Sequence, residues 1–133
     1  MPLPGIEVPL RASGRGALNV WKLEWTWTDG SGTVALDTSQ SDRDPRVATP
    51  VADGGAGIVN VAFPKCDRMW ILSKNLTPAS ATTGTQYRVH EVTDKNVAAG
   101  TCKVRFFDLD GTPTAVEMDS GDRYQLTLLL EYE

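Results

Sequence analysis

Alternation of hydrophobic and polar positions dominates the chain and predicts β-strands. From residue 21 to residue 27 every second side chain is hydrophobic, namely Trp21, Leu23, Trp25 and Trp27. The same pattern returns near the end of the sequence, with Tyr124, Leu126, Leu128, Leu130 and Tyr132. A period of two is typical of a strand with one buried face. Leu129 interrupts the polar side of the second segment, so we expect it to lie in a subunit interface or a second packed layer.

Shorter segments between these two also have the composition of strands, at residues 34–36, 58–63, 69–72, 86–92 and 101–107. Residues 69–72 are continuously apolar, which predicts a fully buried strand, and Tyr87 and Val89 are expected to point inward. Gly-containing turns separate the segments, and no helical period intervenes. This spacing predicts an all-β fold, an antiparallel β-sandwich or jelly roll of about seven or eight strands.

Two segments do not fit the sandwich pattern. Residues 1–16 contain three prolines and three glycines and predict an extended N-terminal arm ahead of a single domain at 17–133. Either a flexible terminus or an arm docked on a neighbouring subunit fits, and the candidate contacts are Leu3, Ile6, Val8, Leu10, Arg11 and Arg15. Residues 37–57 are poor in apolar side chains and predict a long loop that contacts a partner.

Composition narrows the classes of function. Thirteen Lys and Arg against 17 Asp and Glu give a net charge of −4, which offers no broad basic face for nucleic acid. No apolar run approaches the roughly 18 residues that span a bilayer, and the N-terminus lacks the features of a signal peptide. We therefore expect no membrane partner and synthesis in a host cytoplasm. Cys66 and Cys102 lie beside apolar runs and fit either two buried thiols or one disulfide.

One short motif suggests catalysis. Residues 106–112, Phe-Phe-Asp-Leu-Asp-Gly-Thr, resemble the nucleophile motif of haloacid-dehalogenase-like phosphatases, which would make Asp108 the nucleophile and Asp110 the general acid/base. That family opens a parallel α/β domain with the motif, whereas here it lies close to the end of a strand-rich sequence. Asp-Gly also favours a tight β-hairpin turn, which we expect instead. We expect His90 on a surface or an edge, outside any catalytic triad. We therefore predict that the protein is not an enzyme and that it has no catalytic residue, no metal and no cofactor.

The three alternating tryptophans allow two interpretations. Trp21, Trp25 and Trp27 share one face of one predicted strand. If that face is exposed, it resembles the platforms on which sugar-binding modules stack pyranose rings. If a second sheet covers it, the same side chains form the core, to which aromatic residues contribute large buried areas.

The second half of the chain resembles the capsid decoration, or cement, proteins of tailed bacteriophages. The resemblance lies in residues 57–64, Gly-Ile-Val-Asn-Val-Ala-Phe-Pro, in residues 100–108 with the following Asp-Gly turn, and in residues 120–130. It implies a non-enzymatic β-sandwich subunit, a homotrimer on the capsid surface of a virion that binds the major capsid protein, with an extended N-terminal arm. A phage tail-tube, head-completion or fibre component is the alternative within the virion.

Overall fold

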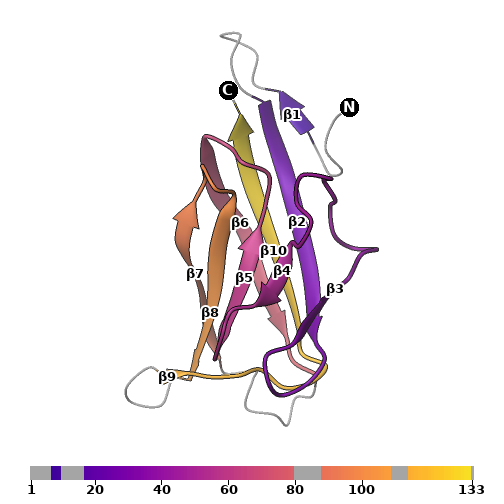
Figure 1. Cartoon of the computed structure of the whole chain (residues 1–133), viewed down its shortest axis with the longest axis vertical. Helices are drawn as coiled ribbons and strands as arrows, with labels where there is room; N and C mark the ends of the chain where they lie inside the picture. Colours follow the sequence, from indigo (N-terminus) through magenta and orange to yellow (C-terminus); the bar gives the residue numbers. More distant parts are fainter. Residues whose placement is uncertain (1–6, 10–16, 80–87, 109–113, 133) are drawn as a thin grey trace.

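The computed structural model describes residues 7–9, 17–79, 88–108 and 114–132, and in these ranges the secondary structure consists of strands (Figure 1). The strands are β1 (Glu7–Pro9), β2 (Ala17–Trp27), β3 (Val34–Leu36), β4 (Val51–Asp53), β5 (Ile58–Ala62), β6 (Arg68–Thr77), β7 (Val89–Asn96), β8 (Thr101–Asp108), β9 (Thr114–Ala115) and β10 (Arg123–Tyr132).

The strands form two antiparallel sheets that face each other. The first sheet has the order β1-β2-β10-β6, with β3 also paired to β2, and the second has the order β4-β5-β8-β7, with β9 also paired to β8. The chain passes from one sheet to the other after β3, β5, β6 and β9, and the long strands β2 and β10 become neighbours as in a jelly roll. The predicted all-β sandwich is therefore confirmed, with eight strands on the two continuous paths.

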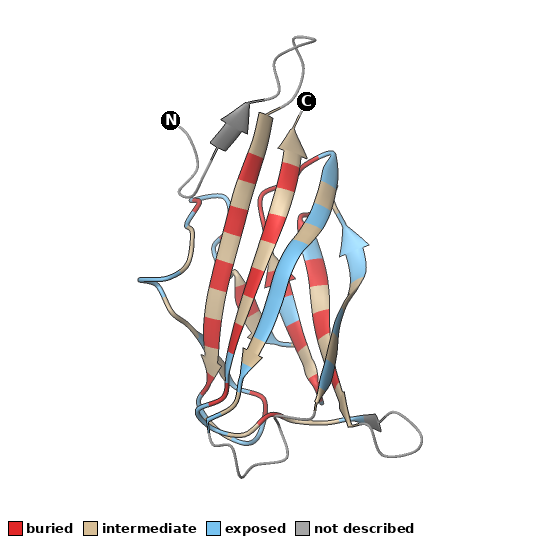
Figure 2. Ribbon diagram, turned by 180° about the vertical axis from the view of Figure 1, so that it is seen from behind, coloured by how far each residue is buried: buried red, intermediate tan, exposed pale blue. Residues whose placement is uncertain are grey.

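The core lies between the sheets and is built by the alternation that the sequence shows. Figure 2 shows this as stripes of buried and half-buried residues along β2 and β10. Trp21, Trp25 and Trp27 are all buried, and the Trp25 ring lies 5.0 Å from that of Tyr124, while Trp27 lies 5.1 Å from Phe106 in an edge-on contact. The tryptophan face is thus core, and the sugar-platform interpretation of these three residues is wrong.

The apolar run at residues 69–72 is not the buried strand that we predicted. It belongs to β6, which is an edge strand of the first sheet, and Trp70 and Leu72 are 43% and 52% exposed. Val89, predicted to point inward, is 40% exposed on β7, the edge strand of the second sheet. In β6, Met69 and Ile71 pack against the core while Trp70 lies on the outer face opposite Leu129, so the continuous apolar run conceals an alternation between the two faces. Both β6 and β7 are edge strands, where side chains are less completely covered.

The segment predicted as one long loop is partly structured. β4 lies within residues 37–57, and the side chains of Val47 and Val51 are buried in the core. Two hydrophobic side chains in a polar stretch are enough to hold it against the sandwich, because each reaches the interior between the sheets. Cys66 and Cys102 are both free and buried, and burial raises the pKa of these thiols to about 11 and about 12.

One end of the sandwich carries the described part of the predicted arm. β1 pairs with the start of β2, Val8 opposite Leu18, at the end of the sandwich where β10 ends and where the chain turns from β7 into β8 (Figure 1). We call this the arm end. The predicted contact residues Leu3, Ile6, Leu10, Arg11 and Arg15 lie outside the described residues.

Candidate functional site

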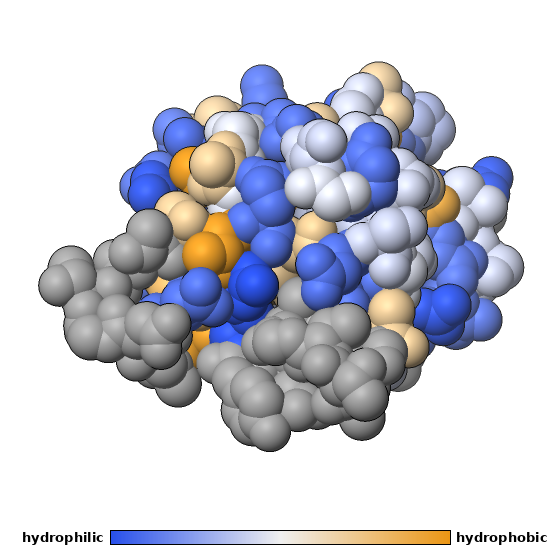
Figure 3. Space-filling model, turned by 90° about the horizontal axis from the view of Figure 1, so that it is seen from below, coloured by the Kyte–Doolittle hydropathy of each residue, from blue (hydrophilic) through white to orange (hydrophobic). Residues whose placement is uncertain are grey.

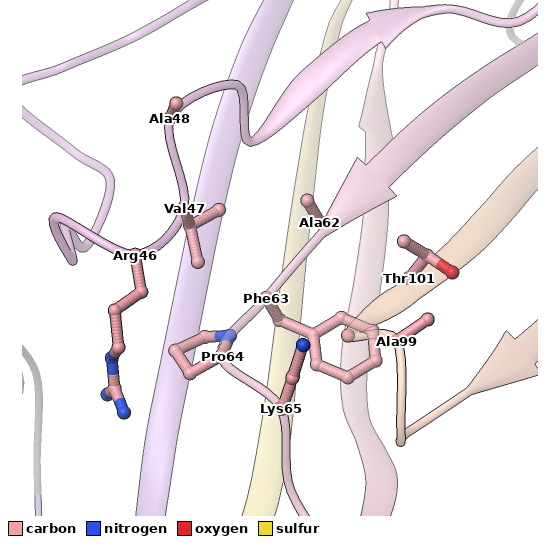
Figure 4. A pocket seen from close by; sticks show the side chains of 10 residues that line it. Arg46, Val47, Ala48, Ala62, Phe63, Pro64, Lys65, Ala99 and Thr101 are labelled. Atoms are coloured by element: carbon pink, nitrogen blue, oxygen red, sulfur yellow. The ribbon is translucent and has the colours of Figure 1, made fainter.

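A shallow pocket of about 370 Å³ opens at the arm end. It lies between residues 46–48, the segment after β5 at residues 62–65, and the turn at residues 99–101. Figure 4 shows Phe63 and Pro64 in the middle, with Arg46 on one side and Ala99 and Thr101 on the other. The buried Phe63 and Pro64 form an apolar floor, so the pocket suits a hydrophobic side chain of a partner.

Two basic side chains lie at the rim of this pocket, and one of them is paired with a carboxylate. Arg46 Nη2 lies 2.6 Å from Oδ2 of the buried Asp44, and this hydrogen bond holds the pKa of the Asp44 carboxyl below its usual range. Lys65 is exposed on the opposite side of Pro64. The residues lining the pocket include no carboxylate, histidine or thiol. The arrangement can bind a segment by apolar contact and by charge.

The outer face of the first sheet carries a row of apolar side chains. Val20 on β2 lies opposite Leu129 on β10, and Leu129 lies opposite Trp70 on β6. Val20 and Leu129 are half-buried, whereas Trp70 is exposed. We call these three residues the apolar row. The sequence pattern identified Leu129 but missed Trp70, because residues 69–72 were assigned to the core.

A β-bulge and two ion pairs border the apolar row. The pairing of β6 with β10 shifts between Thr127 and Leu128, which leaves Leu72 as the extra residue of β6 next to the row. Beyond the row, Arg68 Nε lies 3.6 Å from Glu131 Oε1, and Arg123 Nη1 lies 4.0 Å from Glu24 Oε2. The face is therefore apolar in one band and charge-balanced on either side of it.

The end of the sandwich opposite the arm end looks different. Figure 3 shows that, where this end is drawn in colour, hydrophilic residues predominate and hydrophobic ones appear as separate small areas. Among large hydrophobic side chains, those exposed in the described residues are Trp70, Leu72 and Val89. Trp70 and Leu72 are close in sequence on one strand, which makes β6 and its neighbours the principal candidate for a binding surface.

His90 lies on β7, an edge strand of the second sheet and one of the two kinds of position that we expected, and its ring contacts Tyr124. His90 Nδ1 is 2.7 Å from the Tyr124 hydroxyl, and Lys74 Nζ donates a hydrogen bond of 2.6 Å to the His90 carbonyl. Burial, with a smaller effect of the Lys74 charge, lowers the pKa of His90, and burial raises the pKa of Tyr124. The neutral pair links β7 to β10 and holds the open edge of the sandwich together.

This burial predicts that acid destabilises the fold through His90. Because the folded state lowers the histidine pKa, the unfolded chain takes up the proton first as the pH falls, so stability is full above about pH 6.5 and declines below it. His90 is the only histidine. We expect the urea midpoint to fall between about pH 7.5 and about pH 5.5, and to fall less in His90→Gln. An equal fall in both proteins would contradict this assignment.

The phosphatase-like motif lies in a different structural context from that of the family it resembles. β8 ends at Asp108, which lies opposite Thr114 of the antiparallel β9, as expected for a hairpin. Asp108 Oδ1 lies 3.0 Å from Arg88 Nε, and Arg88 Nη1 donates to the Glu117 carbonyl at 2.7 Å. Asp110 lies outside the described residues. The Asp108 carboxylate thus forms a structural ion pair between β8 and the start of β7, in an antiparallel sheet instead of a parallel one.

Neither a metal cluster nor a membrane-spanning helix occurs in the described residues. No three His, Cys, Asp or Glu side chains in the described ranges come together as a metal ion would require. The same part of the chain contains no helix with the length and apolarity to cross a membrane. Comparisons with protein-family models, with curated proteins and with solved structures find no match to this chain.

Proposed function

We propose that this protein is a non-enzymatic structural subunit of a virion, a decoration protein that binds the outer surface of a phage capsid and clamps neighbouring capsid subunits. The observation that carries the binding role is the exposure of Trp70 and Leu72 beside Leu129 on the outer face of the first sheet. Exposed tryptophan and leucine side chains in one place are typical of surfaces that another protein covers. The virion context rests on the resemblance to phage decoration proteins.

Several acidic and basic side chains are held in ion pairs or hydrogen bonds within the fold, and this supports a binding role over a catalytic one. Asp108 is paired with Arg88, His90 with Tyr124, and the buried Asp122 accepts hydrogen bonds from the backbone N–H groups of Ala79 and Asp119. Each of these groups stabilises a strand end or a sandwich edge. Side chains that are committed to the framework in this way are poorly placed to exchange protons with a substrate.

We assign the two candidate surfaces to two partners. The arm end would meet the major capsid protein, because it combines the apolar floor at Phe63 with Arg46 and Lys65, and the arm itself adds Arg11 and Arg15. Arg46 is paired with Asp44, so Lys65 and the two arginines of the arm sequence would be the charges that attract an acidic surface of the shell. The face with the apolar row would meet other subunits of the same layer, and the resemblance implies a homotrimer.

The test is binding to particles of the virus that encodes the chain. Shells stripped of this protein are incubated with the full-length chain or with a chain lacking residues 1–16, and bound protein is measured by co-sedimentation. We expect full-length protein to bind, and the truncated protein to bind about tenfold more weakly or worse, because the arm adds contact area. The circular dichroism of both proteins serves as the control for folding.

Electron cryomicroscopy of the same particles locates the protein. Density for the sandwich on the outer surface of the shell would support the proposal. Density in the tail would favour the tail-tube, head-completion or fibre alternative, and unchanged shell binding by the truncated chain would contradict the role of the arm.

A further inference from the structure

The apolar row has a geometry that a two-fold axis can use. Its three members lie side by side on the adjacent strands β2, β10 and β6, at the same level of the sheet. The row therefore runs across the strands, along the direction of the interstrand hydrogen bonds. A two-fold axis that lies along this row, in the plane between two such faces, places Val20, Leu129 and Trp70 each opposite its own copy.

The residues on either side of the row are compatible with the same axis. Rotation about this axis reverses the direction of the strands. A residue two positions from the row on one side therefore faces, in the second copy, the residue two positions from the row on the other side. Glu131 then faces Thr127 of the second copy, Leu18 faces Lys22, and Arg68 faces Ser73, as the strand register dictates. No like charges meet at these positions, and Glu131 comes next to Lys22 of the second copy, one strand away. The face is thus complementary to itself in both apolar contact and charge.

The edges of the sandwich are less suitable for pairing with another copy. β6 carries the bulge at Leu72, and its Lys74 is directed toward the second sheet, where it bonds to the His90 carbonyl. β7 has an irregularity between Thr93 and Asn96. Bulges and inward-directed lysines are the devices that keep an edge strand from accepting a further strand.

The outer face of the second sheet is charged where the first is apolar. Asp94 Oδ2 lies 3.6 Å from Lys103 Nζ and 3.4 Å from Arg105 Nη2, so ion pairs occupy the middle of that face. Such a surface is well solvated and gains little from being covered. The apolar row is the surface that gains most from burial.

We infer that this face of the first sheet binds a second copy of the chain around a two-fold axis along Val20, Leu129 and Trp70. The inference rests on the proposed function only in treating the face as an assembly surface, and it replaces the expected trimer contact by a dimer contact. Strands β2, β6 and β10 have 11, 10 and 10 residues. They cover roughly 33 Å by 14 Å, a small interface, so we expect concentration-dependent pairing in the micromolar range.

The test uses the full-length chain in sedimentation-equilibrium runs from about 1 µM to about 500 µM. We expect the mass to rise from one chain to two. Leu129→Glu and Leu129→Lys should each weaken pairing by about tenfold or more, because the axis brings two like charges together. A mixture of the two variants should form a heterodimer that is tighter than the homodimer of either variant, since a residue on the axis faces its own copy.

A matched control variant and a second pair of variants distinguish a loss of pairing from a general effect of the added charge or a failure to fold. Val89→Glu introduces the same charge at a side chain of similar exposure to Trp70 on the other sheet, and it should leave pairing unchanged. If either Leu129 variant does not fold, Trp70→Glu and Trp70→Lys test the same axis at a more exposed position. Thermal melts of each variant establish folding before the masses are compared.

The outcomes separate this inference from the proposed function. A trimer, a monomer at every concentration, or oppositely charged variants that do not pair with one another would overturn the two-fold inference. If any of these occurs while the chain still decorates shells, the proposed function stands without it. If the chain pairs as described but binds no particle, the pairing stands and the virion role fails.

Discussion

Replacing Gly100 by alanine should lower the free energy of unfolding by about 3–4 kcal/mol, the sum of backbone strain and a steric clash. Gly100 has a φ of +72°, and a Cβ atom there would clash with the Phe63 carbonyl oxygen. The backbone cannot simply move away, because the Phe63 N–H donates to the Gly100 carbonyl at 2.9 Å and the Gly100 N–H donates to the Asn96 carbonyl at 2.8 Å. Urea unfolding followed by tryptophan fluorescence measures the loss.

Alanine substitutions at two other glycines separate the effect of backbone strain from the effect of the steric clash. Gly55 has a φ of +111°, and no atom lies within 4 Å of the position that a Cβ atom would take, so Gly55→Ala tests the backbone conformation alone. We expect it to cost about 1–2 kcal/mol. Gly30 has open space and no positive φ, so Gly30→Ala should change stability by less than about 0.5 kcal/mol. If Gly100→Ala were no worse than Gly55→Ala, the close approach of Gly100 to Phe63 would be refuted.

Asp122→Ala should lower the free energy of unfolding by about 3 kcal/mol. Each hydrogen bond to a charged acceptor contributes about 1.5–3 kcal/mol, and relaxation of the surrounding backbone recovers part of the loss. The Asp122 side chain is fully buried. Its two oxygens accept from the N–H groups of Ala79 at 2.8 Å and Asp119 at 2.9 Å. The Asp122 carbonyl also accepts from the Trp27 N–H, so the residue joins the ends of β2, β6 and β10.

Asp29 provides the matched control for Asp122. Its carboxylate also accepts hydrogen bonds from two backbone N–H groups, those of Ser31 and Thr33, but on an exposed turn where water can replace it. We therefore expect Asp29→Ala to destabilise much less than Asp122→Ala in the same urea titration. Asp122→Asn, which keeps one acceptor oxygen, should fall between them. Equal losses for Asp29→Ala and Asp122→Ala would show that burial of the Asp122 carboxylate is not what matters.

Sequence periodicity was sufficient for the centre of the sandwich and failed at its edges. In β2 and β10 the alternation identifies both faces, because each strand has neighbours on both sides and one face is fully covered. In β6 the run Met69–Leu72 predicts a buried strand, but only Met69 and Ile71 pack against the core; Trp70 lies on the outer face opposite Leu129, and the bulge leaves Leu72 exposed. The position of a bulge depends on the partner strand, which lies far away in sequence, so a local pattern cannot reveal it.

The candidate binding surface was predictable only in part for the same reason. Leu129 could be found because a leucine on the polar side of a regular strand is conspicuous. Its neighbours Val20 and Trp70 join it through strand register, which links three distant segments of the chain. His90 shows the same limit: its partner Tyr124 lies on the other sheet, so the sequence around His90 carries no sign of the buried pair.

The bulge in β6 and the lysine beside it also bear on how the protein behaves when it accumulates. A strand edge with exposed tryptophan and leucine is the kind of segment from which cross-β filaments grow, since each added chain extends the backbone ladder by one strand. Here the bulge at Leu72 interrupts the ladder, and Lys74 is directed inward, toward the second sheet, so that a strand added at this edge would have to cover its charge. Association through the apolar row around a two-fold axis stops at two chains, whereas strand addition at the edge of β6 could continue from chain to chain. The fold thereby allows the protein to expose an apolar binding surface at high protein concentration without forming fibres.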